Sequence, residues 1–436
     1  MNVDEINQGL LTGDFDERRL FPSFEKMRKS EFSFKTDFGL EKIPEEPGFI
    51  SIRGARQSGK STWLESNVLN SFKKHGPGST FYLNGDDLKD SNELKIKLEE
   101  TIHLFKPEKT IKYIYIDEIT AIHEWERAIK RLADRGLVQD VLIISTGSKA
   151  TDLRRGGERL PGRKGRLDRS SYLFLPISYR EFKRVCGSHL KNDTFLSYLI
   201  AGGSPIACSE LARNGRIPEY VITLIKDWVF GECALAKRDR ASLLSVTEVL
   251  FRLGGLPIGQ SKLARDAGLA NNTVAEGYVG FLTDLLCIAP TYAWDLDKKI
   301  IVRRKPYKIN FINLLVATSF HPSKIRSIKD FKNRMPEEQG VWLEWLVAQE
   351  LWRRRAKKGE EMPEQLLYWL SNQNEIDFVL DESHFIEVKR GKVSPLDFSW
   401  FYKSFPKGHL KIINQTEFKT QNRTGMTIEN FLLEVQ

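Results

Sequence analysis

The chain has 436 residues, 41% of them hydrophobic and 29% charged, which is the composition of a globular protein long enough for two or three domains. Its net charge of +9 is compatible with nucleic-acid binding but does not establish it. No run of roughly eighteen apolar residues is present, which excludes a membrane span, and the polar amino end argues against a signal peptide. The scattered cysteines fit neither a zinc site nor a disulfide framework, so we expect a cytoplasmic protein.

Residues 1–45 are expected to form an N-terminal extension, and the first chemical signal follows it. The stretch "GFISIRG" is typical of a buried strand, and "GARQSGKST" after it has P-loop spacing. Glycines let backbone N–H groups converge on phosphates, and the following helix contributes its positive end. Lys60 is expected to reach the β- and γ-phosphates of ATP, and the Ser61 hydroxyl to hold Mg²⁺. The predicted nucleotide-binding residues are Gly54, Gly59, Lys60, Ser61 and Thr62.

A P-loop predicts a second strand that ends in an acid, and "IKYIYIDEIT" supplies it. Asp117 fits the Walker B residue that holds Mg²⁺, and Glu118 fits the base that polarises an attacking water. The next apolar run, "VLIISTGSKA", places Thr146 and Ser148 where residues that sense the γ-phosphate would lie. Strands that alternate with helices predict an α/β fold over residues 46–185, a P-loop NTPase with a parallel sheet and helices on both faces. We therefore expect ATP hydrolysis.

The segment from Thr151 to Ser170 is strongly basic. An arginine finger that neutralises the transition state is one interpretation, and Arg163 and Arg166 are its candidates. A solvated loop and a DNA-contacting patch are the alternatives. A finger that acts on a neighbouring subunit would imply a homo-oligomer.

Residues 186–305 are expected to form a helical lid and a winged-helix region. Ser261 can cap a short helix, Gly268 can make a turn, and Asn271 or Asn272 can cap a second helix. The runs "CIAPTYAW" and "KIIVRR" would form the wing. Asn271, Asn272 and Thr273 would begin a recognition helix for DNA. That helix has no lysine or arginine, which favours a role in packing between domains.

Residues 306–436 carry the second chemical signal. "LLYWL", "EIDFVL" and "HFIEVKR" read as three strands, on which Glu387 and Lys389 share a face and Asp377 lies beside them. An upstream helix offers Glu344, and Trp342 and Trp345 on it are expected in the core. Helix, three strands, helix and strand in this order resemble the PD-(D/E)XK nuclease core. Asp377, Glu387 and Glu344 would bind Mg²⁺ or Mn²⁺, and Lys389 would stabilise the transition state. Ordinary charge pairs on a solvated sheet are the alternative.

The order of "GARQSGKST", "YIDEIT", "STGSKA", "PGRKGR", "LPISYREF" and "YLIAGGSPIA" resembles a family of bacterial and archaeal AAA-type ATPases with a nuclease-like C-terminal region. The resemblance implies an ATP-hydrolysing protein that controls a metal-dependent nuclease-like domain acting on nucleic acid, with DNA favoured, in defence against foreign DNA or in repair. Basic runs such as "RRRAKK" and "VRRKPYK" support a phosphate-rich substrate. The alternative is a nucleotide-switched protein whose nuclease-like domain grips nucleic acid or protein without cleaving.

Overall fold

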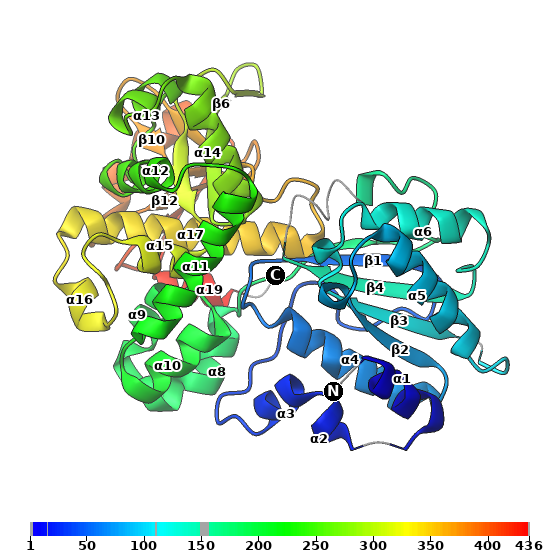
Figure 1. Cartoon of the computed structure of the whole chain (residues 1–436). Helices are drawn as coiled ribbons and strands as arrows, with labels where there is room; N and C mark the ends of the chain where they lie inside the picture. Colours follow the sequence, from blue (N-terminus) through cyan, green and yellow to red (C-terminus); the bar gives the residue numbers. More distant parts are fainter. Residues whose placement is uncertain (1–2, 15, 110, 149–156, 435–436) are drawn as a thin grey trace. The chain divides into compact units, whose positions relative to one another are not determined.

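The computed structural model describes residues 3–14, 16–109, 111–148 and 157–434. The chain divides into two compact units (Figure 1). Unit 1 comprises Met1–Leu175 with Ala356–Gly359, and unit 2 comprises Pro176–Arg355 with Glu360–Gln436. No helix among the described residues is long and apolar enough to span a membrane.

Unit 1 is built on a parallel sheet with strand order β2-β3-β4-β1-β5, and the first four of these strands lie side by side in Figure 1. Its strands are β1 Gly48–Arg53, β2 Thr80–Asn84, β3 Lys112–Asp117, β4 Val141–Gly147 and β5 Ser171–Leu173. The interior residues of β1, β3 and β4 are buried without alternation, as expected of a parallel sheet covered on both faces. The predicted α/β P-loop fold is confirmed at this level.

The helices of unit 1 follow the strands in alternation, after a helical amino-terminal region. They are α1 Val3–Thr12, α2 Glu17–Leu20, α3 Pro22–Arg28, α4 Lys60–His75, α5 Ser91–Leu104 and α6 Trp125–Asp134. The amino-terminal region packs on the sheet through Asn7, whose side-chain amide donates to the carbonyl of Tyr82 and accepts from its N–H, both at 2.8 Å. β2 is an edge strand of the sheet, and Asn7 forms hydrogen bonds with its backbone as a neighbouring strand would.

Unit 2 begins with a run of helices. They are α8 Tyr179–Leu190, α9 Thr194–Ala201, α10 Pro205–Asn214, α11 Glu219–Leu235, α12 Arg240–Arg252, α13 Gln260–Asp266 and α14 Asn272–Asp284. The later helices are α15 Leu314–Phe320, α16 Ile328–Lys332, α17 Pro336–Lys358, α18 Phe401–Ser404 and α19 Ile428–Leu433, and of these α17 has its last three residues in unit 1. Trp342 and Trp345 on α17 are fully buried, as predicted, with ring centroids 5.5 Å apart.

The strands of unit 2 form two sheets. The first has the order β10-β9-β6-β7, with β8 also paired to β6, and the second has the order β11-β12-β13-β15-β14. The strands of the first are β6 Ile288–Asp295, β7 Ile300–Val302, β8 Lys308–Phe311, β9 Leu366–Leu370 and β10 Glu375–Ile376. Those of the second are β11 Phe378–Val379, β12 His384–Val388, β13 His409–Ile413, β14 Phe418–Lys419 and β15 Arg423–Met426.

Two features of these sheets differ from the sequence-based expectation. The predicted wing, β6 and β7, is not separate from the tail, because β6 pairs in parallel with β9. The regions predicted as 186–305 and 306–436 therefore share one compact unit. In addition, the predicted strand "EIDFVL" is broken at Asp377: β10 before it pairs with β9, and β11 after it pairs with β12.

Candidate functional site

The loop between β1 and α4, residues 54–59, has the backbone of a phosphate cradle. Gln57 and Gly59 take positive φ angles of 60° and 99°, the region that favours glycine. A Cβ at Gly54 would lie 2.8 Å from the Cβ of Phe174, so a glycine is needed where the chain beyond β5 passes close by. Because α4 begins at Lys60, its N–H groups and the positive end of its dipole face the loop.

The Lys60 ammonium rests on this loop. It donates to the carbonyl oxygens of Gly54 at 2.9 Å and Ala55 at 2.8 Å. Burial lowers the pKa of Lys60 to about 8, although Glu118 and Asp117 act in the opposite direction. A cation held by loop carbonyls at a helix N-terminus is well placed to exchange those carbonyls for phosphate oxygens.

The acids at the end of β3 and the polar residues at the end of β4 form one network. β4 lies between β3 and β1, so Thr146 and Ser148 stand between the two Walker segments. The Thr146 hydroxyl donates to Asp117 Oδ1. Glu118 Oε1 accepts from the backbone N–H and the hydroxyl of Ser148, both at 2.9 Å, and its backbone has a φ of 47°. Both hydroxyls therefore hold the acids in place.

Two further residues lie beside these acids, and the sequence-based reasoning missed both of them. A Cβ at Gly85 would collide with the Glu118 carbonyl, so this glycine lets the end of β2 approach the site. The second residue is Asp86, directly after Gly85. Burial and the charge of Glu118 raise its pKa, and the charge of Arg56 in the P-loop acts in the opposite direction. The available signal was "NGDD" after a strand, because the carboxyl ends of parallel strands meet at one edge of the sheet.

The residues present fit Mg²⁺ at the nucleotide site. Ser61 is exposed in the first turn of α4, and Asp117 ends β3. A hydroxyl and a carboxylate are the kind of oxygen donors that Mg²⁺ takes together with phosphates and water. Thr62, also in this first turn, is partly buried.

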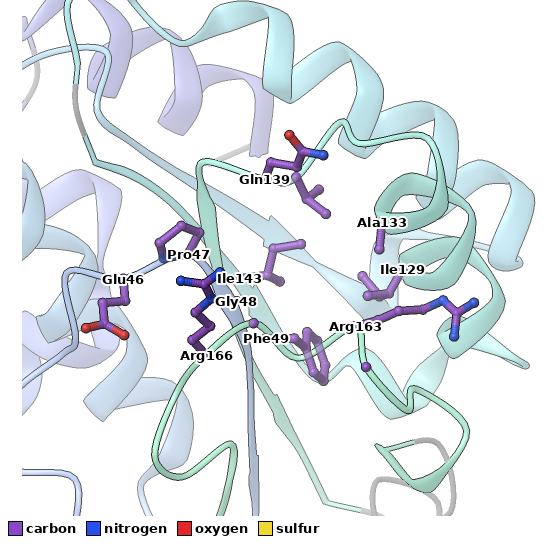
Figure 2. A pocket seen from close by; sticks show the side chains of 13 residues that line it. Glu46, Pro47, Gly48, Phe49, Ile129, Ala133, Gln139, Ile143, Arg163 and Arg166 are labelled. Carbon is purple, nitrogen blue, oxygen red and sulfur yellow. The ribbon is translucent and has the colours of Figure 1, made fainter.

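The predicted arginine-finger residues lie far from this site. Arg163 and Arg166 line a cavity of about 550 Å³ with Gly48 and Phe49, the first residues of β1 (Figure 2). The P-loop follows the last residue of β1, and a strand of this length spans roughly 20 Å. Neither arginine therefore reaches the P-loop of its own chain, and Arg163 instead donates to Asp134 at 2.5 Å. Residues 151–156 of the same basic segment are outside the described residues.

Glu65 connects the amino-terminal region to α4. Its Oε2 accepts a hydrogen bond of 2.8 Å from the backbone N–H of Phe24, and the residue is buried. Burial raises the pKa of Glu65 to about 7, although the hydrogen bond from Phe24 acts against the rise. The charged form of Glu65 is thus disfavoured in the folded state.

This burial predicts a pH-dependent stability effect. The folded-state pKa lies above the ordinary value of 4.5, so the stabilisation by Glu65 is fully present below that value and is lost as pH rises through about 7. Glu65→Gln keeps an acceptor without the charge, and we expect it to raise the free energy of unfolding by up to about 3 kcal/mol at pH 8 and little at pH 5. Urea unfolding at both pH values measures this. Glu100→Gln, on an exposed face of α5, is the control, and equal stability of Glu65→Gln and wild type at pH 8 would contradict the prediction.

The second predicted site is a cavity of about 560 Å³ in unit 2. The structure brings Glu344 of α17, Asp377, Glu387 of β12 and Lys389 together on its wall. Asp377 Oδ2 accepts from the N–H of Val388 at 2.9 Å, and Glu387 Oε2 accepts from the N–H of Asp377 at 3.2 Å. Burial raises the pKa of Glu344 and of Glu387 above the ordinary value of a glutamate.

Lys308, the first residue of β8, stands at the centre of this cluster and was not predicted. Its side chain is 1% exposed, and its Nζ lies 3.1 Å from Glu344 Oε1 and 2.7 Å from Asp377 Oδ1. It also forms an ion pair with Glu375, a second residue that the sequence-based reasoning missed. Burial disfavours the ammonium, but these carboxylates outweigh it and raise the pKa of Lys308 well above its usual value.

The predicted divalent ion does not fit this arrangement. Within the described part of the chain, no three His, Cys, Asp or Glu side chains are arranged to hold a metal ion. The physical reason is that the Lys308 ammonium already contacts the oxygens of Glu344 and Asp377 that would face such an ion.

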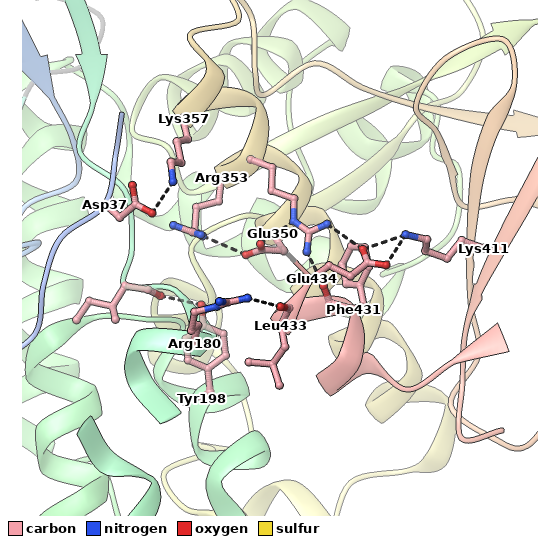
Figure 3. Close-up of polar contacts among 12 residues, drawn as sticks. Asp37, Arg180, Tyr198, Glu350, Arg353, Lys357, Lys411, Phe431, Leu433 and Glu434 are labelled. Carbon is pink, nitrogen blue, oxygen red and sulfur yellow. Dashed lines mark hydrogen bonds and ion pairs between the residues drawn. The ribbon is translucent and has the colours of Figure 1, made fainter. Parts of the chain in front are cut away.

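The first two arginines of the basic run "RRRAKK" at the end of α17 do not face solvent. Arg353 and Arg354 are buried and bind Glu350 of the same helix, at 3.1 and 2.7 Å (Figure 3). Arg354 also donates to the carbonyl of Phe431, and Glu434 beyond it pairs with Lys411. Arg354 therefore links α17 to α19, and neither arginine presents its charge to a ligand.

The helix-turn-helix pattern is present as α13, a turn at Gly268 with φ of 65°, and α14. Asn271 caps α14 as predicted, with its side chain accepting from Val274 N–H at 3.0 Å. Ser261 lies inside α13, whose N-cap is Gly259, so that predicted cap is wrong. Asn272 and Thr273 are exposed at the start of α14. Exposed cations follow β7, at Arg303, Arg304 and Lys305.

The comparisons with known proteins agree with a nucleotide site in unit 1. Residues 46–183 match the family model described as an AAA domain. Most of the matched segment lies in unit 1 and includes the P-loop. An uncharacterized protein of Methanocaldococcus jannaschii, MJ1544, is 22% identical over 355 residues, which cover 76% of this chain and 71% of that protein.

Two solved structures match this chain in part, at low sequence identity. The Walker-type ATPase PABY2304 of Pyrococcus abyssi is 14% identical with a TM-score of 0.43, covering 71% of this chain and 96% of its own. The ORC1 protein of Aeropyrum pernix, solved in complex with DNA, is 12% identical with a TM-score of 0.33, covering 70% of this chain and 90% of its own.

Proposed function

We propose that the AAA domain hydrolyses ATP and that the nucleotide state controls unit 2. The observation that carries the proposal is the network in which Ser148 holds Glu118 and Thr146 holds Asp117 at the edge of the sheet where the P-loop lies. Lys60 would exchange its loop carbonyls for phosphate oxygens, and Glu118 would orient the attacking water. Mg²⁺, held by Ser61 and Asp117, would neutralise phosphate charge. Release of phosphate from purified protein given ATP and Mg²⁺ tests this.

We infer that an arginine finger in this protein would act between subunits. Arg163 and Arg166 lie at the opposite end of β1 from their own P-loop. We therefore infer that either arginine would complete a neighbouring subunit's site in a homo-oligomer. An ATP-hydrolysis rate per chain that rises with protein concentration would support this arrangement, and a rate that is independent of concentration would count against it.

We further propose that unit 2 binds nucleic acid, with DNA favoured, or a protein partner without metal-dependent cleavage. The position of Lys308 among the acids of the cavity supports this reading. Exposed cations at residues 303–305, next to a helix-turn-helix, supply the charge that a phosphate backbone requires. ATP would then govern assembly on that partner.

A binding prediction follows from those cations. The triple change Arg303→Ala, Arg304→Ala and Lys305→Ala should weaken DNA binding about tenfold or more and reduce its salt dependence, because fewer counterions are released. Fluorescence anisotropy with labelled duplex at two salt concentrations measures both. Lys403→Ala with Lys407→Ala, which removes exposed charge elsewhere in unit 2, is the control. Unchanged affinity of the triple variant would exclude this surface.

The second candidate is an ATP-controlled, metal-dependent nuclease for defence or repair. It is favoured by the gathering of Glu344, Asp377, Glu387 and Lys389 on one cavity. Incubation with Mg²⁺ or Mn²⁺ and several forms of DNA or RNA, with and without ATP, separates the two candidates. Cleavage that disappears in Asp377→Ala would establish the nuclease, whereas binding without cleavage would support the switch.

A further inference from the structure

We propose that Lys308 is the resident cation of the carboxylate cluster in unit 2, occupying the place of a divalent ion, so that this cavity takes no metal in the native protein. The inference deepens the proposed function of unit 2, for which it supplies the reason that no cleavage occurs. It rests on contacts, burial and charge within unit 2 alone.

The ammonium contacts three carboxylates. An ammonium has three N–H donors, and Lys308 donates to Glu344 and Asp377 and forms an ion pair with Glu375. These acids come from α17, from β10 and from the junction after it, so they converge from separate elements on one point. That point is where a metal ion bound by Glu344 and Asp377 would have to lie.

The other oxygens of Asp377 and Glu387 also have partners. Asp377 Oδ2 accepts from the Val388 N–H, and Glu387 Oε2 accepts from the Asp377 N–H. Glu387 Oε1 lies 2.5 Å from the Nζ of Lys389. A divalent ion would have to displace both lysine ammonium groups to gain the same oxygens.

Lys308 is held in this position by its strand. It pairs with Thr291 in the antiparallel ladder between β8 and β6, and Tyr307 before it and Ile309 after it are buried. The ring of Tyr368 lies 5.9 Å from its Nζ. Because the side chain is 1% exposed, the ammonium is shielded from solvent in this position.

The charge of the cavity is consistent with an internal cation. Among the described residues that line it, acids outnumber the cations Lys308, Lys389 and Arg390. A lining in which acids outnumber cations offers a phosphodiester no net positive charge. With Lys308 in place of a divalent ion, the cluster is stable, but it carries too little positive charge to draw a phosphate in.

The test is Mn²⁺ binding to the full chain without nucleotide, measured by electron paramagnetic resonance on wild type, Asp377→Asn, Lys308→Met and the double variant. We expect wild type and Asp377→Asn to bind the same amount of Mn²⁺. Lys308→Met, which keeps an unbranched stem but removes the charge, should gain one tightly bound ion per chain. The double variant should lose that ion again.

Two outcomes would overturn the proposal: wild-type Mn²⁺ binding that falls in Asp377→Asn, or a folded Lys308→Met that gains no ion. If Lys308→Met fails to fold, the comparison of wild type with Asp377→Asn decides alone. ATP hydrolysis is measured on the same preparations. Its absence would count against the proposed ATPase and leave the assignment of Lys308 untouched.

Discussion

Glu118→Gln is expected to reduce ATP hydrolysis by a factor of about 10²–10³ while leaving ATP binding intact. The glutamine keeps the size of the side chain and an oxygen that can accept from Ser148, so the end of β3 should retain its shape. It removes the negative charge that would polarise an attacking water. The loss should therefore appear in kcat and not in the affinity for nucleotide.

Phosphate release at saturating ATP, together with titration of a fluorescent ATP analogue, separates the two quantities. The control is Glu124→Gln. Glu124 lies in the same segment and pairs with Arg127 on the surface, so this variant should hydrolyse ATP at the wild-type rate. A Glu118→Gln protein with normal turnover would show that another group, such as Asp86, orients the water. A protein that no longer binds nucleotide would show that Glu118 shapes the P-loop instead.

Lys308→Ala should destabilise unit 2 by about 3–5 kcal/mol, because it leaves buried carboxylates without their partner. Glu344 and Asp377 contribute most to this cost, since both are buried. Combining Lys308→Met with Asp377→Asn and Glu344→Gln removes the buried charges of Lys308 and its partners at similar volume and leaves only the partly exposed Glu375, so most of the lost stability should return.

Urea unfolding followed by tryptophan fluorescence reports mainly on this unit, because seven of the nine tryptophans lie in it. The matched control is Lys299→Ala, whose side chain is 59% exposed and pairs with Glu382, and its loss should cost less than about 1 kcal/mol. A Lys308→Ala protein as stable as this control would show that the ion pairs around Lys308 contribute no net stability.

The nucleotide site could be predicted from sequence because its parts are local. A strand, a glycine-rich turn and a helix follow one another around Lys60, and parallel pairing brings the ends of β3 and β4 to the same edge. Asp117, Glu118, Thr146 and Ser148 therefore meet as expected. The sequence did not show that the hydroxyls bind the acids, since this depends on side-chain rotamers.

The second site was predictable only in part. Asp377 and Glu387 are near neighbours on a hairpin, but Lys308 lies 69 residues before Asp377 and reaches it from another strand. In the sequence, Lys308 belongs to the basic run "VRRKPYK", where burial cannot be distinguished from exposure. The available signal was a lysine that opens the apolar strand "KINF". The prediction for Arg353 and Arg354 was wrong for the same reason. In the sequence alone, arginines that form a buried ion pair with Glu350 cannot be distinguished from surface charges.

The bond between Asn7 and Tyr82 has a consequence for how the chain behaves in crowded solution. The outermost strand of an open sheet offers unsatisfied amide and carbonyl groups to any passing polypeptide, which is a route to aggregation. By saturating the middle of β2 with one side-chain amide, the first helix shields that edge from intermolecular strand addition. The amino-terminal residues thus contribute to colloidal stability as well as to folding.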